Sequence, residues 1–447
     1  MLIIMSKKTL ISQDVKNKKP IQKSERVYLD FASQTMPSKK VLSEMKKVEK
    51  FNFNPNNIYK EGQDAESILS EARTRAARTF GVKPHEIYFT GNATLSCATA
   101  IFGVVEYFKN KFQNKKIDKV PHVITSNMEH LAVLENIKYL EKAGVIEVSY
   151  IEVDENGMVN AEQVEKEIKE NTILVSVMYV NNEVGTIQDI KSVAKKIKDW
   201  KKKKKRDIFS YPYFHTDASQ AGNYLSLYID MLGVDLLSLN GSKIYGPKSS
   251  GVLFKKEKIN LSPFYFGGGQ ERNIFSGTVD IEKCVGISFA IEEAQKKITN
   301  TKVLESISIK RNNLLNNIFK NIPEAKLIGS WNENEWKVEK KGISRDDREA
   351  KRLPSNISIW LPDFPSDEMV LRLNEKGFAV SAGSACSAKS DEYSHVIFNI
   401  SKNNFNKAKS QKVARETIRI SIDDSTNEVD LERFSKILKE IYFKFKK

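Results

Sequence analysis

The stretch HVITSNMEHLAVLENIKYLEKAGVIEVSYIEV, residues 122–153, shows the order of elements that decides the fold. It begins with HVITS and ends with IEVSYIEV, two runs rich in β-branched residues. Between them, LAVLENIKYLEKAG carries apolar residues three and four positions apart, which is the spacing of an amphipathic helix. The stretch therefore predicts a strand, a helix and a second strand, the unit from which parallel sheets are built.

The same alternation extends on both sides of this stretch, from about Glu86 to Phe254. The runs EIYFT, TILVSVMYV, YFHTDAS, DLLSLN and GVLF also read as strands, which makes seven in all. Strands that alternate with helices favour a mostly parallel sheet covered on both faces. We therefore predict an α/β fold, with a large domain built on a mostly parallel seven-stranded sheet.

The last third of the chain has a different pattern and predicts a smaller α+β domain. Long helical segments flank the strand-like runs NISIWL and TIRISI, and two stretches with few apolar residues, 329–352 and 401–416, are predicted to be loop insertions. The predicted organisation is a polar tail over 1–24, a segment over 25–45 that packs with the small domain, a large domain over 46–297 and a small C-terminal domain over 298–447.

Composition narrows the class of protein. The chain has 447 residues, of which 40% are apolar, as in a globular protein. No apolar run approaches the roughly 20 residues of a membrane helix, and the N-terminal MLIIM is too short for a signal-peptide core. The three cysteines, Cys97, Cys284 and Cys386, form neither a disulfide framework nor a metal pattern. We expect a cytoplasmic protein without a bound metal.

The net charge of +15 is partly local, because Lys201–Lys205 is an unbroken lysine run. Such a run could contact nucleic acid or an acidic partner. Charge runs are more often solvated faces, and no aromatic-interleaved surface accompanies this one. Direct nucleic-acid binding is therefore not expected.

Polar residues follow five of the predicted strands, and ligands of parallel sheets bind at the carboxyl ends of the strands. The residues Gly91-Asn92-Ala93-Thr94 lead into a helix, whose N-terminus suits a phosphate. The other strand ends carry the sequences NMEH with His130, NNEVG with Asn182, ASQ with Gln220, and GSKIYGPK with Lys243.

Several of these residues suit the chemistry of an aldehyde cofactor such as pyridoxal phosphate. Lys243 could form a Schiff base with it, and Asp217 could keep its ring nitrogen protonated. His130 could stack over the ring and move protons. Taken singly, each has an ordinary alternative: a surface lysine, an aspartate that caps a turn, and a structural histidine.

Two residues stand out for their surroundings. Arg419 lies in the strand-like run ETIRISI, where burial without a fixed carboxylate from protein or substrate would be costly. Cys386 lies in SAGSACS, where small residues leave little to bury it, as suits a reactive and accessible thiol. Asn182 and Gln220 could hydrogen-bond a phenolic oxygen or a substrate carboxylate, or could be ordinary loop amides.

In this order, the pieces resemble the cysteine desulfurases, pyridoxal-phosphate enzymes of fold type I related to class-V aminotransferases. The resemblance extends from VYLDFASQT to ETIRISI and rests on TSNMEHLAVL, YVNNEVGTIQDI, HTDASQAGN, SKIYGPK, GGGQERN followed by SGT, and SAGSACS. SAGSACS is similar to the branch with a long cysteine loop. The resemblance implies a homodimer that converts L-cysteine to L-alanine and transfers the sulfur to Cys386 as a persulfide.

The resemblance also implies roles for individual residues. Cys386 would be the nucleophile, and Asn182 and Arg419 would hold the substrate carboxylate. Thr278, in SGT, would reach the phosphate of the partner subunit. The remaining cofactor contacts would come from Lys243 (covalently), Asp217 (ring nitrogen), Gln220 (phenolic oxygen), His130 (ring face and proton transfer), Asn182, and Ala93, Thr94, Asn240 and Ser242 (phosphate region).

The blocks depart from the family pattern at three places. Leu95 stands where the phosphate block commonly has Glu, Asn240-Gly241-Ser242 replaces Ser-Gly-His before the lysine, and Phe275 replaces an Arg before SGT. Alternative functions are selenocysteine lysis, transamination, or a catalytically silent scaffold homologue. The expected use of the sulfur is iron–sulfur cluster assembly or RNA thiolation, through a sulfur-accepting scaffold or carrier protein.

Overall fold

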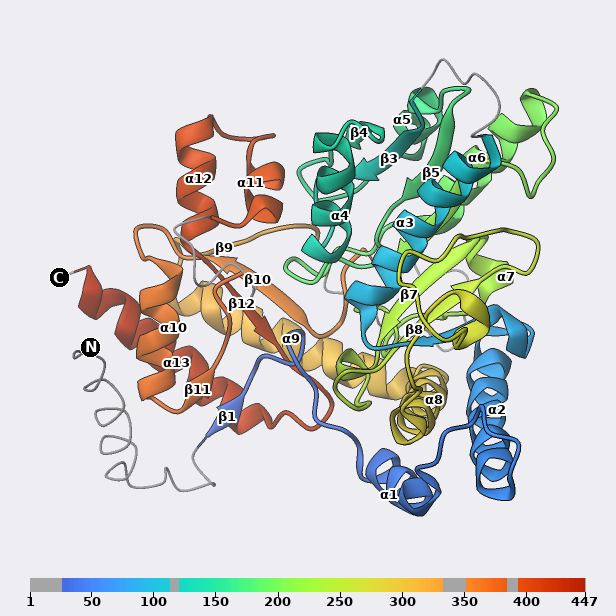
Figure 1. The fold of residues 1–447 in the computed structure, drawn as a ribbon. Coiled ribbons are helices and arrows are strands. Elements are labelled where there is room, and N and C mark those ends of the chain that lie inside the picture. The colour runs from blue at the N-terminus through green and yellow to red at the C-terminus, as the bar shows by residue number, and fades with distance from the viewer. Residues whose placement is uncertain (1–25, 113–119, 333–350, 384–392, 447) are drawn as a thin grey trace, which may run out of the picture.

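The computed structural model describes residues 26–112, 120–332, 351–383 and 393–446. Its largest sheet has seven strands in the order β2-β8-β7-β6-β5-β3-β4 (Figure 1). Only β8 runs antiparallel to its neighbours in this sheet, so the predicted mostly parallel seven-stranded sheet is confirmed. The strands are β2 (Ile87–Thr90), β3 (His122–Ser126), β4 (Glu147–Ile151), β5 (Thr172–Ser176), β6 (Tyr213–Asp217), β7 (Leu236–Asn240) and β8 (Gly251–Lys255).

Helices cover both faces of this sheet, as neighbouring residues within a strand show. Val123 of β3 and Leu174 of β5 pack in one cluster with α3 and α4, whereas Ile124 and Val175 pack in another with α2 and α6. Burial on both faces explains why these strands read as continuous apolar runs. The helices are α1 (Lys39–Val48), α2 (Lys60–Phe80), α3 (Ala93–Phe112), α4 (Leu131–Lys142), α5 (Ala161–Glu167), α6 (Ile190–Lys203), α7 (Ile229–Leu232) and α8 (Ile281–Lys297).

A buried histidine ties three central strands together beneath the site. The ring nitrogens of His215 on β6 lie 2.8 Å from Ser176 Oγ on β5 and 2.9 Å from Ser238 Oγ on β7. Burial lowers the pKa of His215 to about 4, so the ring is neutral at pH 7. These contacts support the end of β6, where Asp217 lies.

The C-terminal third forms the predicted α+β arrangement around a small sheet of order β12-β10-β9. Near the N-terminus, β1 (Val27–Tyr28) pairs in parallel with β11 of this third. The elements are α9 (Thr301–Asn321), β9 (Lys326–Leu327), β10 (Asn356–Trp360), α10 (Ser366–Glu375), β11 (Phe378–Ala379), α11 (His395–Ser401), α12 (Lys407–Arg415), β12 (Thr417–Ser421) and α13 (Glu428–Phe445).

The prediction of a loop insertion over 401–416 is wrong, because α12 occupies most of it. Three small or apolar residues, Ser410, Val413 and Ala414, form its buried stripe, and polar residues cover the rest. The spacing is helical, but three buried positions among many lysines gave too weak a signal to read as a helix. Most of the other predicted insertion, 329–352, lies outside the described residues.

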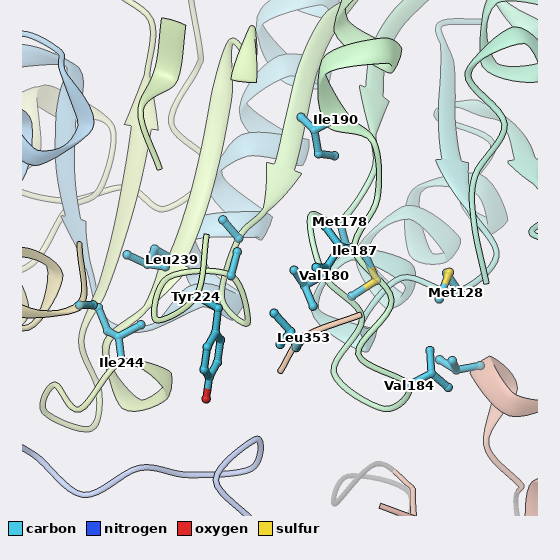
Figure 2. Packing of buried hydrophobic residues seen from close by; sticks show 14 of the residues in the cluster. Met128, Met178, Val180, Val184, Ile187, Ile190, Tyr224, Leu239, Ile244 and Leu353 are labelled. Carbon is cyan, nitrogen blue, oxygen red and sulfur yellow. The ribbon is translucent and has the colours of Figure 1, made fainter. Parts of the chain in front are cut away.

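Side chains of the loop that follows β5 pack against a segment that is distant in the chain. Figure 2 shows Met178, Val180 and Ile187 gathered beside Leu353, which belongs to the C-terminal third. Asn181 caps the turn, since its Oδ1 accepts the backbone N–H groups of Glu183 and Val184 at 2.8 and 3.0 Å. These contacts hold the loop in place.

Among the described residues, none of the helices has the length and apolar character that crossing a membrane requires.

Candidate active site

Lys243 lies at the end of a short 3-10 turn, η3 (Gly241–Lys243), directly after β7. Gly241 allows this tight turn, because a Cβ there would lie 2.1 Å from Ser250 Oγ. The Lys243 Nζ donates to the carbonyls of Ala32 at 3.0 Å and Ser33 at 2.5 Å. The amine therefore faces a segment near the N-terminus, which lies across the site.

Asp217 and Gln220 follow the neighbouring strand β6. Asp217 is 6% exposed, and its Oδ1 accepts the backbone N–H of Ser219 at 2.9 Å. The Gln220 Nε2 donates to the Ala32 carbonyl at 2.9 Å, so it shares that acceptor with Lys243. The buried Ser219 Oγ, beside them, has no hydrogen-bond partner in the described structure.

His130 is the N-cap of α4, and its Nδ1 accepts the backbone N–H of Ala132 at 3.0 Å. Burial lowers the pKa of His130 below its ordinary value, and the nearby Lys243 acts in the same direction, while Asp217 opposes them. With Nδ1 acting as an acceptor, the neutral ring carries its proton on Nε2. His130 can therefore present its Nε2–H as a hydrogen-bond donor to the cavity.

The N-terminus of α3 supplies the predicted phosphate region. Ala93 and Thr94 begin this 20-residue helix, and the preceding Asn92 accepts the Leu95 N–H on its Oδ1 at 2.9 Å. Unpaired N–H groups and the helix dipole favour an anion there. Leu95 at the family's Glu position leaves that end without an added negative charge.

Arg419, on β12, is 2% exposed and is bound to other parts of the chain. Its Nη2 contacts Asp30 Oδ1 at 2.8 Å and Ser33 Oγ at 2.5 Å, and its Nη1 donates to the Asn182 carbonyl at 3.0 Å. The carboxylate expected from its burial thus comes from the protein, through one oxygen rather than a bidentate pair. Arg419 Nε is buried and has no hydrogen-bond partner among the described residues.

Replacing Asp30 by alanine is expected to lower the free energy of unfolding by about 3 kcal/mol, because it leaves the buried Arg419 guanidinium without its counter-charge. Urea denaturation of the variant and the wild type measures this difference. An Asp30→Asn variant, which keeps an oxygen acceptor, should lose less. Equal stability of the alanine variant and the wild type would contradict this role of Asp30.

Nine of the twelve predicted site residues line one cavity at the carboxyl ends of the strands, namely Ala93, Thr94, His130, Asn182, Asp217, Gln220, Asn240, Lys243 and Arg419. Ser242 is adjacent, with its Oγ 3.2 Å from Asn240 Oδ1. Thr278 instead lines a second cavity with Gly91 and Phe275. Cys386 lies outside the described residues, within 384–392. The structure therefore brings together residues from five strand ends and from β12.

Three residues near the N-terminus, which contact Arg419 and Lys243, were not predicted as site residues from the sequence. Asp30, Ala32 and Ser33 contact Arg419, Gln220 and Lys243, although VYLDFASQT contributed only to the resemblance. An acidic residue directly after a short apolar run is a usable signal, because it needs a cationic partner if buried. The departure at Phe275 places its ring in a stack with Tyr265, with centroids 5.8 Å apart.

Comparison with known proteins shows the family. The model of the aminotransferase class-V family matches residues 27–434, which is most of the chain. The chain belongs to the class-V aminotransferase family. The fold agrees, since a solved structure of a NifS-like protein matches with a TM-score of 0.77 and 29% identity, covering 94% of this chain and 100% of that one.

Within the class-V family, this chain is similar to proteins named cysteine desulfurase IscS. The protein of that name from Dictyoglomus turgidum is 36% identical over 372 residues, which cover 83% of this chain and 84% of that protein. The one from Methanosarcina thermophila is 32% identical and covers 95% of this chain and 93% of its own. A structure of SspA in complex with cysteine matches with 29% identity and a TM-score of 0.66, over 90% of this chain and 99% of that one. The resemblance drawn from the sequence motifs is thus confirmed.

Proposed function

We propose that this protein is a pyridoxal-phosphate-dependent cysteine desulfurase that converts L-cysteine to L-alanine and takes up the sulfur as a persulfide on Cys386. One observation carries the proposal: Lys243, Asp217 and His130, which follow separate strands of the large sheet, line the same cavity as Arg419 of β12. Its relatives named cysteine desulfurases support the same activity.

The cavity fits pyridoxal phosphate by the chemistry of its residues. Lys243 and Asp217 line it, as do Ala93 and Thr94 at the N-terminus of α3, and so does Ser219, whose buried Oγ has no hydrogen-bond partner among the described residues. Lys243 would hold the cofactor, Asp217 and Gln220 would bind its ring, and Thr94 with Asn240 and Ser242 would bind its phosphate. The bound cofactor supplies an aldehyde for the substrate amine and a protonated ring that accepts electrons.

The chain's own residues would orient the substrate and move its protons. Arg419 and Asn182 would bind the substrate carboxylate, Lys243 would exchange protons at the substrate carbons, and His130 would take part in the proton transfers. The Cys386 thiolate would form an S–S bond with the substrate sulfur while the Cβ–S bond breaks. The cysteine thiol is oxidised to a persulfide and the substrate Cβ is reduced to the methyl group of alanine, so electrons balance.

The test is alanine and sulfide formation from L-cysteine by the protein loaded with pyridoxal phosphate, with a thiol reductant present. Equal amounts of the two products are expected, and Cys386→Ser should lower the rate about 100-fold, because the added thiol is a poorly placed sulfur acceptor. A Cys386→Ser variant with full activity would favour a lyase that needs no protein thiol. A cofactor-loaded wild type without products would favour transamination, selenocysteine lysis or a silent scaffold.

The proposal includes delivery of the sulfur through an acceptor protein rather than directly to RNA. The lysine run supports this, since Lys201 is buried and donates to the Ile208 carbonyl, while Lys203 and Lys204 pair with Glu165 and Glu170. Two of the five lysines are therefore already paired with carboxylates, and a third is buried. The homodimer, the cytoplasmic location and the use in iron–sulfur cluster assembly or RNA thiolation stay predictions.

A further inference from the structure

We propose that Glu183 is a positioning residue for the sulfur-transfer step: its buried carboxylate joins the substrate-binding loop to the flank that follows the segment carrying Cys386, and lies against the flank that precedes it. The inference rests on the proposed function. In this role Glu183 contacts neither substrate nor cofactor. It sets the position of the substrate-binding loop relative to the segment that carries Cys386.

Glu183 is held firmly on the substrate side. It directly follows Asn182 in the chain and is only 1% exposed to solvent. Asn181 Oδ1 accepts its N–H at 2.8 Å, and Asn356 Nδ2 donates to its carbonyl at 3.2 Å. Its position is therefore linked to that of Asn182, whose carbonyl binds Arg419.

The same carboxylate oxygen meets the residues on both sides of 384–392. Ser394 Oγ donates to Glu183 Oε2 at 2.5 Å, and Ser394 also caps α11 by accepting the Ile397 N–H at 3.1 Å. On the other flank, Gly383 lies so close that a Cβ on it would be 3.3 Å from Glu183 Oε2. Gly383 also has a φ of +68°, which favours glycine. Cys386 lies between these two flanks in the chain; the flank after it is hydrogen-bonded to this oxygen, and the flank before it lies beside the same oxygen.

The flank before the segment is also joined to Arg419. Ser381 and Arg419 exchange two backbone hydrogen bonds, of 3.1 and 2.7 Å, and Ser381 Oγ donates to the Gly383 carbonyl at 3.0 Å. A chain of hydrogen bonds therefore joins Asn182 to Arg419, Arg419 to Ser381, and Ser381 to Gly383, which lies beside Glu183. The groups that would hold the substrate carboxylate and the flanks of the thiol segment form one unit.

The burial of the Glu183 carboxylate indicates that its hydrogen bond with Ser394 is more than an incidental contact. A buried carboxylate is costly unless it accepts hydrogen bonds, and a charge-assisted hydrogen bond from a hydroxyl is among the stronger ones. A nucleophile displaced by about 1 Å can lose about 100-fold in rate. Removing the tie should therefore slow attack by the Cys386 thiol while leaving the substrate's own site intact.

The experiment separates these two steps in the cofactor-loaded protein. Persulfide formation on Cys386 in a single turnover with L-cysteine is followed by mass spectrometry. Exchange of the α-proton of L-alanine in deuterated water is followed by NMR, and this exchange needs no protein thiol. We expect Glu183→Ala to slow persulfide formation about 100-fold and to change the exchange rate less than about twofold. Glu183→Gln, which keeps an acceptor oxygen for Ser394, should recover most of the loss.

Two further variants protect the test against misfolding. Ser394→Ala removes the same hydrogen bond from the other side, and the double variant should be no slower than the slower single one, because both break one tie. Asp235→Ala, a matched control, removes a buried carboxylate at the opposite end of β7, where Oδ2 accepts the Phe214 N–H at 3.0 Å. It should leave the ratio of the two rates unchanged.

Each alternative outcome has a distinct meaning. If both rates fall together in Glu183→Ala, Glu183 acts on substrate or cofactor binding, and the inference is overturned. It is also overturned if persulfide formation is unchanged, or if the two single variants have additive effects. A wild type that exchanges alanine protons but forms no persulfide from L-cysteine overturns the proposed function itself, and the inference with it.

Discussion

Replacing Lys243 by alanine is expected to lower sulfide release from L-cysteine by about four orders of magnitude. The Nζ lies at the cavity within reach of the Ala32 and Ser33 carbonyls, and the other lysines of the described structure do not line this cavity. The variant loses both the covalent attachment of the cofactor and a proton carrier. Steady-state sulfide release, with pyridoxal phosphate in excess, measures the effect.

The fold should tolerate this change, because the turn before Lys243 is held by other contacts. Asn240 Oδ1 accepts the Ser242 N–H at 3.3 Å, and Gly241 N–H donates to the Ser250 carbonyl at 2.9 Å. Lys248→Ala, an exposed lysine of the same loop, is the matched control and should retain activity. Activity within tenfold of the wild type in Lys243→Ala would refute the assignment of this lysine.

Asp217→Asn is expected to lower the same rate about 10³-fold. The amide keeps the size of the side chain and an oxygen for the Ser219 N–H, but it carries no charge to keep the cofactor ring nitrogen protonated. The rate loss should therefore come with little change in stability. Sulfide release and thermal unfolding of the loaded protein, measured side by side, test both expectations.

Asp235→Asn provides the comparison for Asp217→Asn. Asp235 is also buried, at 7% exposure against 6% for Asp217, but it lies at the amino end of β7, away from the cavity. It should change stability more than activity. If the two variants lost activity equally, burial of a carboxylate rather than its place at the cofactor would explain the effect of Asp217→Asn.

Much of the fold and of the cavity could be predicted because both depend on local signals. Five of the seven strands are followed by chemically reactive or polar residues, and parallel strands place those ends at one edge of the sheet. His130, Asp217 and Lys243 were predicted from their strand ends and share one cavity. The helix α12 was not predicted, because its buried stripe of three residues is too small to give a clear periodic signal in the sequence.

The residue types at the strand ends, the order of strands and helices, and the family motifs are properties of the sequence by itself. Only the tertiary structure decided how Arg419 is paired, because Asp30 lies 389 positions away in the chain. It likewise decided that Glu183 meets Ser394, across 211 positions. The physical reason is that periodicity reports which face of an element is buried, whereas the partner of a buried charge depends on how distant elements pack.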